Sequence, residues 1–229
     1  MYFDYTYLIF VVPALLLALW AQTKVQSTFK KYSAVISARR MTGSEAARRI
    51  LDANGLYNVK INRVAGNLTD HFDPRNNTVN LSDTVYDNPS VAAIGVAAHE
   101  SGHAVQHAVG YSPMKLRTAI IPITNIGSRL AVPLVLIGIL FSFYQLAYIG
   151  CIFYATLALF QLVTLPVEFN ASNRALEALE NTGILGIEEI KGSKKVLSAA
   201  AMTYVAALAT ALAQLLRLIV MVNGRRNRR

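Results

Sequence analysis

The sequence has one cysteine, one tryptophan and few charged residues among its 229 residues. A single cysteine excludes an intrachain disulfide framework and a cysteine-cluster metal site. Charged residues make up 15% of the chain, against about 25% in soluble domains, and hydrophobic residues make up 54%. Because the apolar residues are also clustered in long runs, this composition predicts membrane helices.

Negative charge is scarce as well, and the chain carries a formal net charge of +9. An excess of this size can indicate a nucleic-acid partner. The basic residues, however, lie mostly beside the apolar segments and in residues 225–229. Membrane topology explains that distribution more simply, so we expect a lipid bilayer and no nucleic acid as a partner.

Four apolar segments approach or exceed the roughly 20 residues that a helix needs to cross a bilayer. They are residues 7–21, 118–143, 146–167 and about 199–222. The first reaches this length with Tyr2 and Phe3 ahead of it, and no basic residue precedes it as in a signal peptide. The second and third are so close in sequence that they are expected to form a helical hairpin.

The hydrophilic region after the first apolar segment contains signals for a small α+β structure. Thr42 and Glu45 form a capping-box pattern that predicts a short helix ending near Asn54-Gly55. Residues 59–64 and 78–81 have the patterns of short strands, with turn-forming residues between them. Two roles are open for these strands: an exposed edge that pairs with an extended peptide, or a sheet that only packs against the next helix.

A longer helix is predicted between Asn88 and Gly110. Asn88 is a suitable N-cap before Pro89 at the first helical position, and Gly110 is a suitable stop. This helix would have about 21 residues and a length of about 30 Å. Residues 91–98 are apolar nearly all round, so the helix is expected to be buried.

An HExxH motif lies in the middle of this helix, within the sequence AAHESGHA at residues 97–104. Residues i and i+4 share one helix face, so His99 and His103 can present two imidazoles to one metal ion, with Glu100 in reach of a bound water. This is the pattern of zinc peptidases. Zinc lowers the pKa of water towards about 7, and Glu100 would accept the proton and pass it to the departing amine.

A catalytic zinc needs a third protein ligand besides His99 and His103. His107 lies eight residues after His99, about 12 Å along the helix axis, so packing or an outer role is expected for it. His71 lies in the strand region, but its spacing does not single it out. Glu168 is favoured, because two apolar segments separate it from the first hydrophilic region and place both on one side of the membrane. Its alternative is an exposed acid at a helix N-terminus.

Three segments carry a resemblance to a known family. They read LTDHFDPR at residues 68–75, AIGVAAHESGHA at residues 93–104 and LPVEFNAS at residues 165–172. Together they resemble the bacterial neutral zinc metallopeptidases of the YugP type, which are membrane relatives of the gluzincin endopeptidases. The resemblance covers almost the whole chain. It implies one catalytic zinc ion bound by His99, His103 and Glu168, with Glu100 as general base and acid.

The chain departs from this family pattern at two positions. An acidic residue usually stands where Asn170 is, and a basic residue usually stands where Asn173 is. Both departures lie close in sequence to Glu168, so they concern the surroundings of the proposed ligands and not the ligands themselves. Nearby Arg174 is a candidate donor to the oxyanion of the tetrahedral intermediate.

We therefore expect an α-helical membrane protein with about four transmembrane helices and a small α+β zincin-like catalytic region, located in the bacterial cell membrane as a multi-pass protein. The expected regions are a transmembrane helix over residues 1–21, a catalytic region with the HExxH helix over 22–117, a transmembrane hairpin over 118–167, a helical segment with the third zinc ligand over 168–198, and a transmembrane helix with a basic tail over 199–229.

Charge indicates which side the catalytic region faces. Lys24, Lys30 and Lys31 closely follow the first apolar segment, and basic residues concentrate on the cytoplasmic side of membrane proteins. Four crossings would, however, put the basic tail outside, against the same tendency. The alternatives to a cytoplasmic catalytic region are therefore an inverted orientation or a last segment that does not cross fully.

The favoured function is an integral-membrane zinc-dependent endopeptidase that hydrolyses peptide bonds of proteins at or near the membrane. The alternative is a catalytically silent membrane scaffold that retains the metallopeptidase fold, which intact Glu100 disfavours. A transporter or channel is suggested by Arg129 and Arg217 inside apolar segments, but neither has an obvious acidic partner there. For Arg129, snorkelling to a lipid headgroup is the simpler interpretation.

Overall fold

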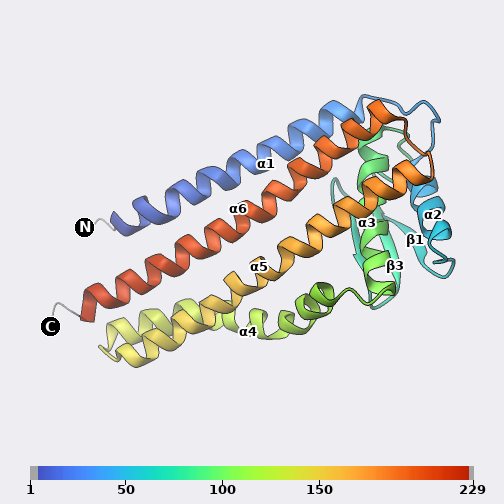
Figure 1. Cartoon of the computed structure of the whole chain (residues 1–229). Coiled ribbons are helices and arrows are strands. Elements are labelled where there is room, and N and C mark those ends of the chain that lie inside the picture. Colours follow the sequence, from blue (N-terminus) through green and yellow to red (C-terminus); the bar gives the residue numbers. More distant parts are fainter. Residues whose placement is uncertain (1–4, 227–229) are drawn as a thin grey trace. The chain divides into compact units, whose positions relative to one another are not determined.

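The computed structural model describes residues 5–226, which form helices and one small sheet (Figure 1). Tyr2, Phe3 and the last two arginines of the basic tail lie outside the described residues. The chain divides into two compact units. The helical unit comprises the described parts of residues 1–22, 116–165 and 202–229, and the α+β unit comprises residues 23–115 and 166–201.

Within residues 5–226, four helices are long and apolar enough to cross a membrane, as expected. Their bounds are Tyr7–Ser33 (a π-helical turn, η1, at Tyr7–Val11, followed by α1 at Val12–Ser33), α4 at Ser112–Leu140, α5 at Tyr144–Asn181 and α6 at Ile187–Arg226. Within the helical unit, Val135 of α4, Ala147 and Cys151 of α5 and Leu218 of α6 share one buried cluster. Arg129 is exposed, and the Arg217 guanidinium lies 5.1 Å from the centre of the Tyr7 ring.

The sheet of the α+β unit has the strand order β1–β3–β2. Its bounds are β1 at Lys60–Val64, β2 at His71–Asp73 and β3 at Thr78–Ser82. Strand β1 runs parallel to β3 and β2 antiparallel to it, so Val79 of the central strand faces Ile61 on one side and Phe72 on the other. Two of the three strands match the sequence prediction, and β2 is an addition.

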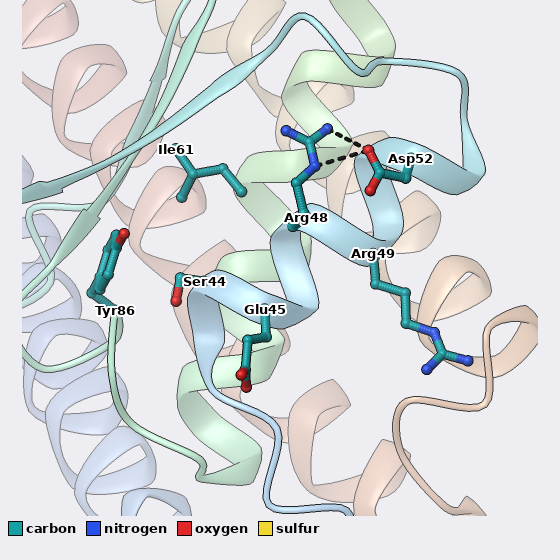
Figure 2. Close-up of a pocket in the computed structure, with 7 residues that line it drawn as sticks. All are labelled: Ser44, Glu45, Arg48, Arg49, Asp52, Ile61 and Tyr86. Carbon is teal, nitrogen blue, oxygen red and sulfur yellow. Dashed lines mark hydrogen bonds and ion pairs between the residues drawn. The ribbon is translucent and has the colours of Figure 1, made fainter.

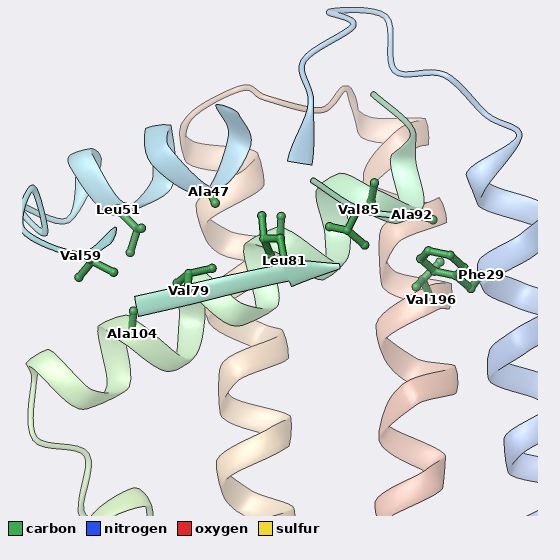
Figure 3. Close-up of a cluster of buried hydrophobic side chains, with 12 residues drawn as sticks. Phe29, Ala47, Leu51, Val59, Val79, Leu81, Val85, Ala92, Ala104 and Val196 are labelled. Carbon is green, nitrogen blue, oxygen red and sulfur yellow. The ribbon is translucent and has the colours of Figure 1, made fainter. Parts of the chain in front are cut away.

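The central strand supplies the core of this unit. Val79 and Leu81 are fully buried and belong to one cluster with Leu51 of α2 (Gly43–Ala53) and Ala104 of α3 (Val91–Ala108) (Figure 3). Small residues on α3 let the strand side chains pack closely against the helix, because alanine leaves little bulk between the two backbones. The sheet therefore holds α3 in place along most of its length.

The start of α2 agrees with the predicted capping box. The Thr42 hydroxyl accepts a hydrogen bond from the Glu45 backbone N–H at 3.3 Å, and the Glu45 carboxylate accepts one from the Thr42 N–H at 2.8 Å. These two bonds satisfy backbone donors that the first turn of a helix leaves free. The hydrogen bonds formed by Thr42 also lower the pKa of the Glu45 carboxyl below its ordinary value.

The start of α3 corrects a prediction. The N-cap is Ser90 and not Asn88: the Ser90 hydroxyl accepts from the Ala93 N–H at 3.2 Å. Asn88 lies two residues earlier, and its side-chain oxygen accepts a hydrogen bond from the Ser90 N–H at 3.0 Å. Both residue types cap helices well, and the serine is the one that reaches the first turn. The helix consequently has 18 residues.

Helix α5 corrects a second prediction, because the helical segment that was expected to begin at Glu168 is the last part of a longer helix. The helix runs without a break from Tyr144 through Pro166 to Asn181. Glu168 is 2% exposed, so the alternative of an exposed acid at a helix N-terminus is wrong. Its carboxylate must find partners inside the α+β unit, because a buried charge without a partner is strongly unfavourable.

Candidate metal centre

The two histidines of the HExxH motif lie next to each other on α3, with ring centres 4.7 Å apart. Glu168 approaches them from α5: its Oε2 atom is 3.3 Å from His99 Nε2 and 3.5 Å from His103 Nε2. One ligand atom from each residue lies within 4.8 Å of the others. Within residues 5–226, this is the group of histidine, cysteine and acidic side chains that could hold a metal ion.

The distances from the Glu168 carboxylate to the two imidazoles fit zinc. Bonds of about 2.0–2.1 Å and tetrahedral angles put neighbouring ligand atoms about 3.3–3.4 Å apart. The two distances between imidazole nitrogen and carboxylate oxygen, 3.3 and 3.5 Å, agree with that spacing. Two imidazoles and one carboxylate are also a donor set of catalytic zinc sites, in which the fourth position stays open.

Gly102 allows α5 to come close enough for this contact. A Cβ atom at Gly102 would lie only 2.7 Å from the backbone oxygen of Ala171. Because Ala171 is three residues after Glu168 on α5, the missing side chain brings the backbone that carries Glu168 close to the helix that carries the histidines. The glycine inside HExxH is therefore a packing requirement of the site.

Each histidine makes a second contact through its other ring nitrogen. His99 Nδ1 lies 3.2 Å from the Ser172 hydroxyl, and His103 Nδ1 lies 3.0 Å from the side-chain oxygen of Gln106. Gln106 and Ser172 do not figure among the sequence predictions. The available signal is helical spacing: Gln106 follows His103 by three residues and Ser172 follows Glu168 by four, so each shares a face with a predicted ligand.

Asn170 and Arg174 extend this network on α5. The Gln106 amide donates to Asn170 Oδ1 at 2.9 Å and to the Val167 backbone oxygen at 2.8 Å. Arg174 Nε also donates to Asn170 Oδ1, at 2.9 Å. Asn170 is therefore a junction between the two helices that carry the candidate ligands.

Burial changes the acid–base properties of the site. Desolvation raises the pKa of the Glu100 carboxyl above its ordinary value, although the charges of His103 and His99 act in the opposite direction. For His103, burial alone would lower the pKa, but the hydrogen bond to Glu168 and the charge of Glu100 outweigh it and raise the value. Glu100 is thus a more basic carboxylate than one in water.

The two other histidines lie apart from this group. His71 is exposed on β2, where its ring contacts the Thr69 backbone oxygen at 2.9 Å and the Asn80 side chain at 3.3 Å. His107 is also exposed and packs against the ring of Phe72, with ring centres 5.7 Å apart. A packing role for His107 agrees with the sequence prediction.

A surface hollow of about 630 Å³ lies elsewhere on the α+β unit, over α2 (Figure 2). The Arg48 guanidinium in this hollow already has partners within the protein. It forms an ion pair with Asp52 at 2.8 Å and donates to the backbone oxygens of Val59 and Leu56. These bonds tie α2 to the loop before β1. Arg48 therefore has a structural role in this unit.

Comparison with known proteins gives two matches. Residues 7–223 match the model of a family described as "Putative neutral zinc metallopeptidase". The chain is 47% identical over 220 residues to a Bacillus subtilis (strain 168) protein named "Putative membrane protease YugP", with 96% of this chain and 98% of the relative covered. No solved structure matches significantly.

Proposed function

Because the chain belongs to the neutral zinc metallopeptidase family, we propose that it is an integral-membrane zinc-dependent endopeptidase acting on proteins at or near the membrane. It is a membrane protein with four helices of suitable length and apolarity. The observation that carries the proposal is the convergence of His99, His103 and Glu168 with the spacing of zinc ligands. Buried Glu100 beside them supplies a base, which a purely structural site does not need.

In the proposed mechanism, His99, His103 and Glu168 hold one zinc ion. When bound, zinc is a Lewis acid that polarises the scissile carbonyl and lowers the pKa of water. Glu100 accepts a proton from the attacking water and delivers it to the nitrogen of the departing amine. Ser172 and Gln106 would hold the two imidazole rings in place, with both Nε2 atoms on the side of Glu168.

The catalytic region in this proposal comprises residues 22–117 and 168–198 and faces the cytoplasm of a multi-pass protein. The support for this orientation is the group of basic residues that directly follows the first apolar segment, including Lys24, Lys30 and Lys31. All three lysines are exposed. Substrate proteins would accordingly be cleaved on the cytoplasmic side, close to the bilayer.

The test compares purified full-length wild type with Glu100→Gln. The amide keeps the size of the side chain but cannot accept the proton, so both proteins should bind about one zinc per chain and only the wild type should cleave casein. A chelator should abolish cleavage and added zinc should restore it. Zinc content is measured by elemental analysis and cleavage by release of peptides.

Two results would contradict the proposal. Cleavage by Glu100→Gln at the wild-type rate would remove Glu100 as the base. A wild type that binds zinc but cleaves neither casein nor membrane-protein substrates would favour the silent scaffold.

A further inference from the structure

Gln106 is a completely buried amide inside the α+β unit, with 0% of its surface exposed. Its oxygen and both of its N–H donors are used: the oxygen faces His103 Nδ1, and the NH₂ group donates to Val167 O and Asn170 Oδ1. A buried amide is tolerated when its polar groups are satisfied in this way. Rotating it by half a turn would direct its oxygen at two other oxygens, so only one orientation is favourable.

Arg174 fixes the direction of these hydrogen bonds. A guanidinium is permanently protonated and can only donate, so the Asn170 oxygen that it contacts must accept. The same oxygen then accepts from the Gln106 NH₂ group, which turns the Gln106 oxygen towards His103. Since that oxygen can only accept, His103 Nδ1 must carry the proton.

We propose that Arg174, Asn170 and Gln106 form a directional hydrogen-bond chain that holds the His103 proton on Nδ1 and so leaves Nε2 free to bind zinc. The inference rests on the zinc site proposed above. A neutral imidazole carries its single proton on either nitrogen, and only the form with the proton on Nδ1 has a lone pair on Nε2. These three are positioning residues, because they act on the metal through His103.

The partner of the Nδ1 atom differs between His99 and His103. Its Nδ1 atom lies beside the Ser172 hydroxyl, which can donate or accept. A hydroxyl therefore stabilises either tautomer of His99, whereas the chain that starts at Arg174 stabilises one tautomer of His103. The proposed proton control is specific to one of the two histidines.

The experiment measures the zinc dissociation constant of the purified full-length protein by competition with a chromophoric chelator. Gln106→Leu removes the acceptor for His103 Nδ1 and should weaken zinc binding by about 10- to 100-fold, the range for partners of metal-binding histidines. Asn170→Leu should weaken it in the same direction. Asn170→Asp should stay close to wild type, because a carboxylate also accepts from both Gln106 and Arg174.

The matched control is Asn173→Leu, which makes the same change at an exposed position of the same helix. It should bind zinc as the wild type does. Cobalt substitution adds a spectroscopic readout, because a displaced imidazole changes the visible absorption of the bound ion. We expect an altered cobalt spectrum for Gln106→Leu and Asn170→Leu, and a wild-type spectrum for Asn170→Asp and Asn173→Leu.

The outcomes separate this inference from the proposed function. If the wild type binds zinc tightly and folded Gln106→Leu binds it equally well, the hydrogen-bond chain has no role in metal binding. If Gln106→Leu fails to fold, the Asn170 pair decides, and equal affinities for Asn170→Leu and Asn170→Asp overturn the inference. Wild type that binds zinc without cleaving peptides contradicts only the proposed activity, and wild type that binds no zinc contradicts both.

Discussion

Glu168 is a carboxylate that the fold removes almost completely from water. Burying such a charge is costly unless other groups compensate it, and its compensation comes from two imidazole nitrogens on a different helix. In the proposed site a zinc ion would add two positive charges at the same point. In this proposal the main contribution of Glu168 is to metal binding, because burying a charge adds little to stability.

A test of this role at the residue scale is Glu168→Ala. Removing one of three ligands should weaken zinc binding by more than about 100-fold, beyond the effect of losing an outer partner. The measurement is the zinc dissociation constant of the purified protein. Glu177→Ala provides the control, because Glu177 is an exposed acid on the same helix and should be neutral. Equal zinc affinities for the two variants would remove Glu168 from the ligand set.

Individual residues of the site differ in how far the sequence reveals them. His99, Glu100 and His103 form a recognisable spacing, and Glu168 is reached by tracing the apolar segments. Gln106 and Ser172 are not predicted, because a buried glutamine or serine has no pattern of its own. Their roles depend on which atoms α3 and α5 bring together, and that is a property of tertiary packing.

At the scale of elements, two glycines of α3 set how closely other helices approach it. Gly102 faces the backbone of Ala171 on α5, whereas a Cβ atom at Gly95 would lie 3.0 Å from the Ser193 hydroxyl on α6. The backbone of Ala171 cannot rotate away from an added methyl group, but the side chain of Ser193 can change its position. The same substitution at the two positions therefore has different consequences.

Gly102→Ala should push α5 away from α3 and displace Glu168. Overpacking of this kind costs about 1–3 kcal/mol, against a gain of about 1 kcal/mol in helix propensity. We expect weaker zinc binding together with a lower melting temperature, measured by chelator competition and thermal unfolding. In Gly95→Ala the contact is with α6, so zinc affinity should remain at the wild-type level. A Gly102→Ala protein with unchanged zinc affinity would contradict the packing explanation.

Elements with strong local signals follow the sequence prediction closely. The capping box of α2 and the central strand β3 are examples, because hydrogen-bonding side chains and a run of apolar residues mark them directly. Strand β2 has only three residues and exists by pairing with β3, so its own sequence gives little signal. Pro166 and the polar residues after it indicate the start of a new helix, but in the structure α5 continues through them.

At the scale of the whole molecule, the proposed orientation can be tested by labelling. In a Cys151→Ala background, a single cysteine replaces either Lys31 or Gln145, both of which are exposed. Lys31 follows the apolar segment of α1, and Gln145 follows the turn between α4 and α5. A membrane-impermeant thiol reagent added to intact cells should label Gln145→Cys and spare Lys31→Cys. The reverse pattern would mean that the catalytic region faces outward. Permeabilised cells, in which both should react, are the control.

The division of the metal site between α3 and α5 also bears on the order of events in synthesis. The motif histidines are made well before Glu168, and the apolar segments of residues 118–167 lie between them. With the proposed ligands, a growing chain cannot complete its zinc site until this hairpin has been translated. In this proposal the chain therefore has no protease activity until the residues up to Glu168 have been synthesised.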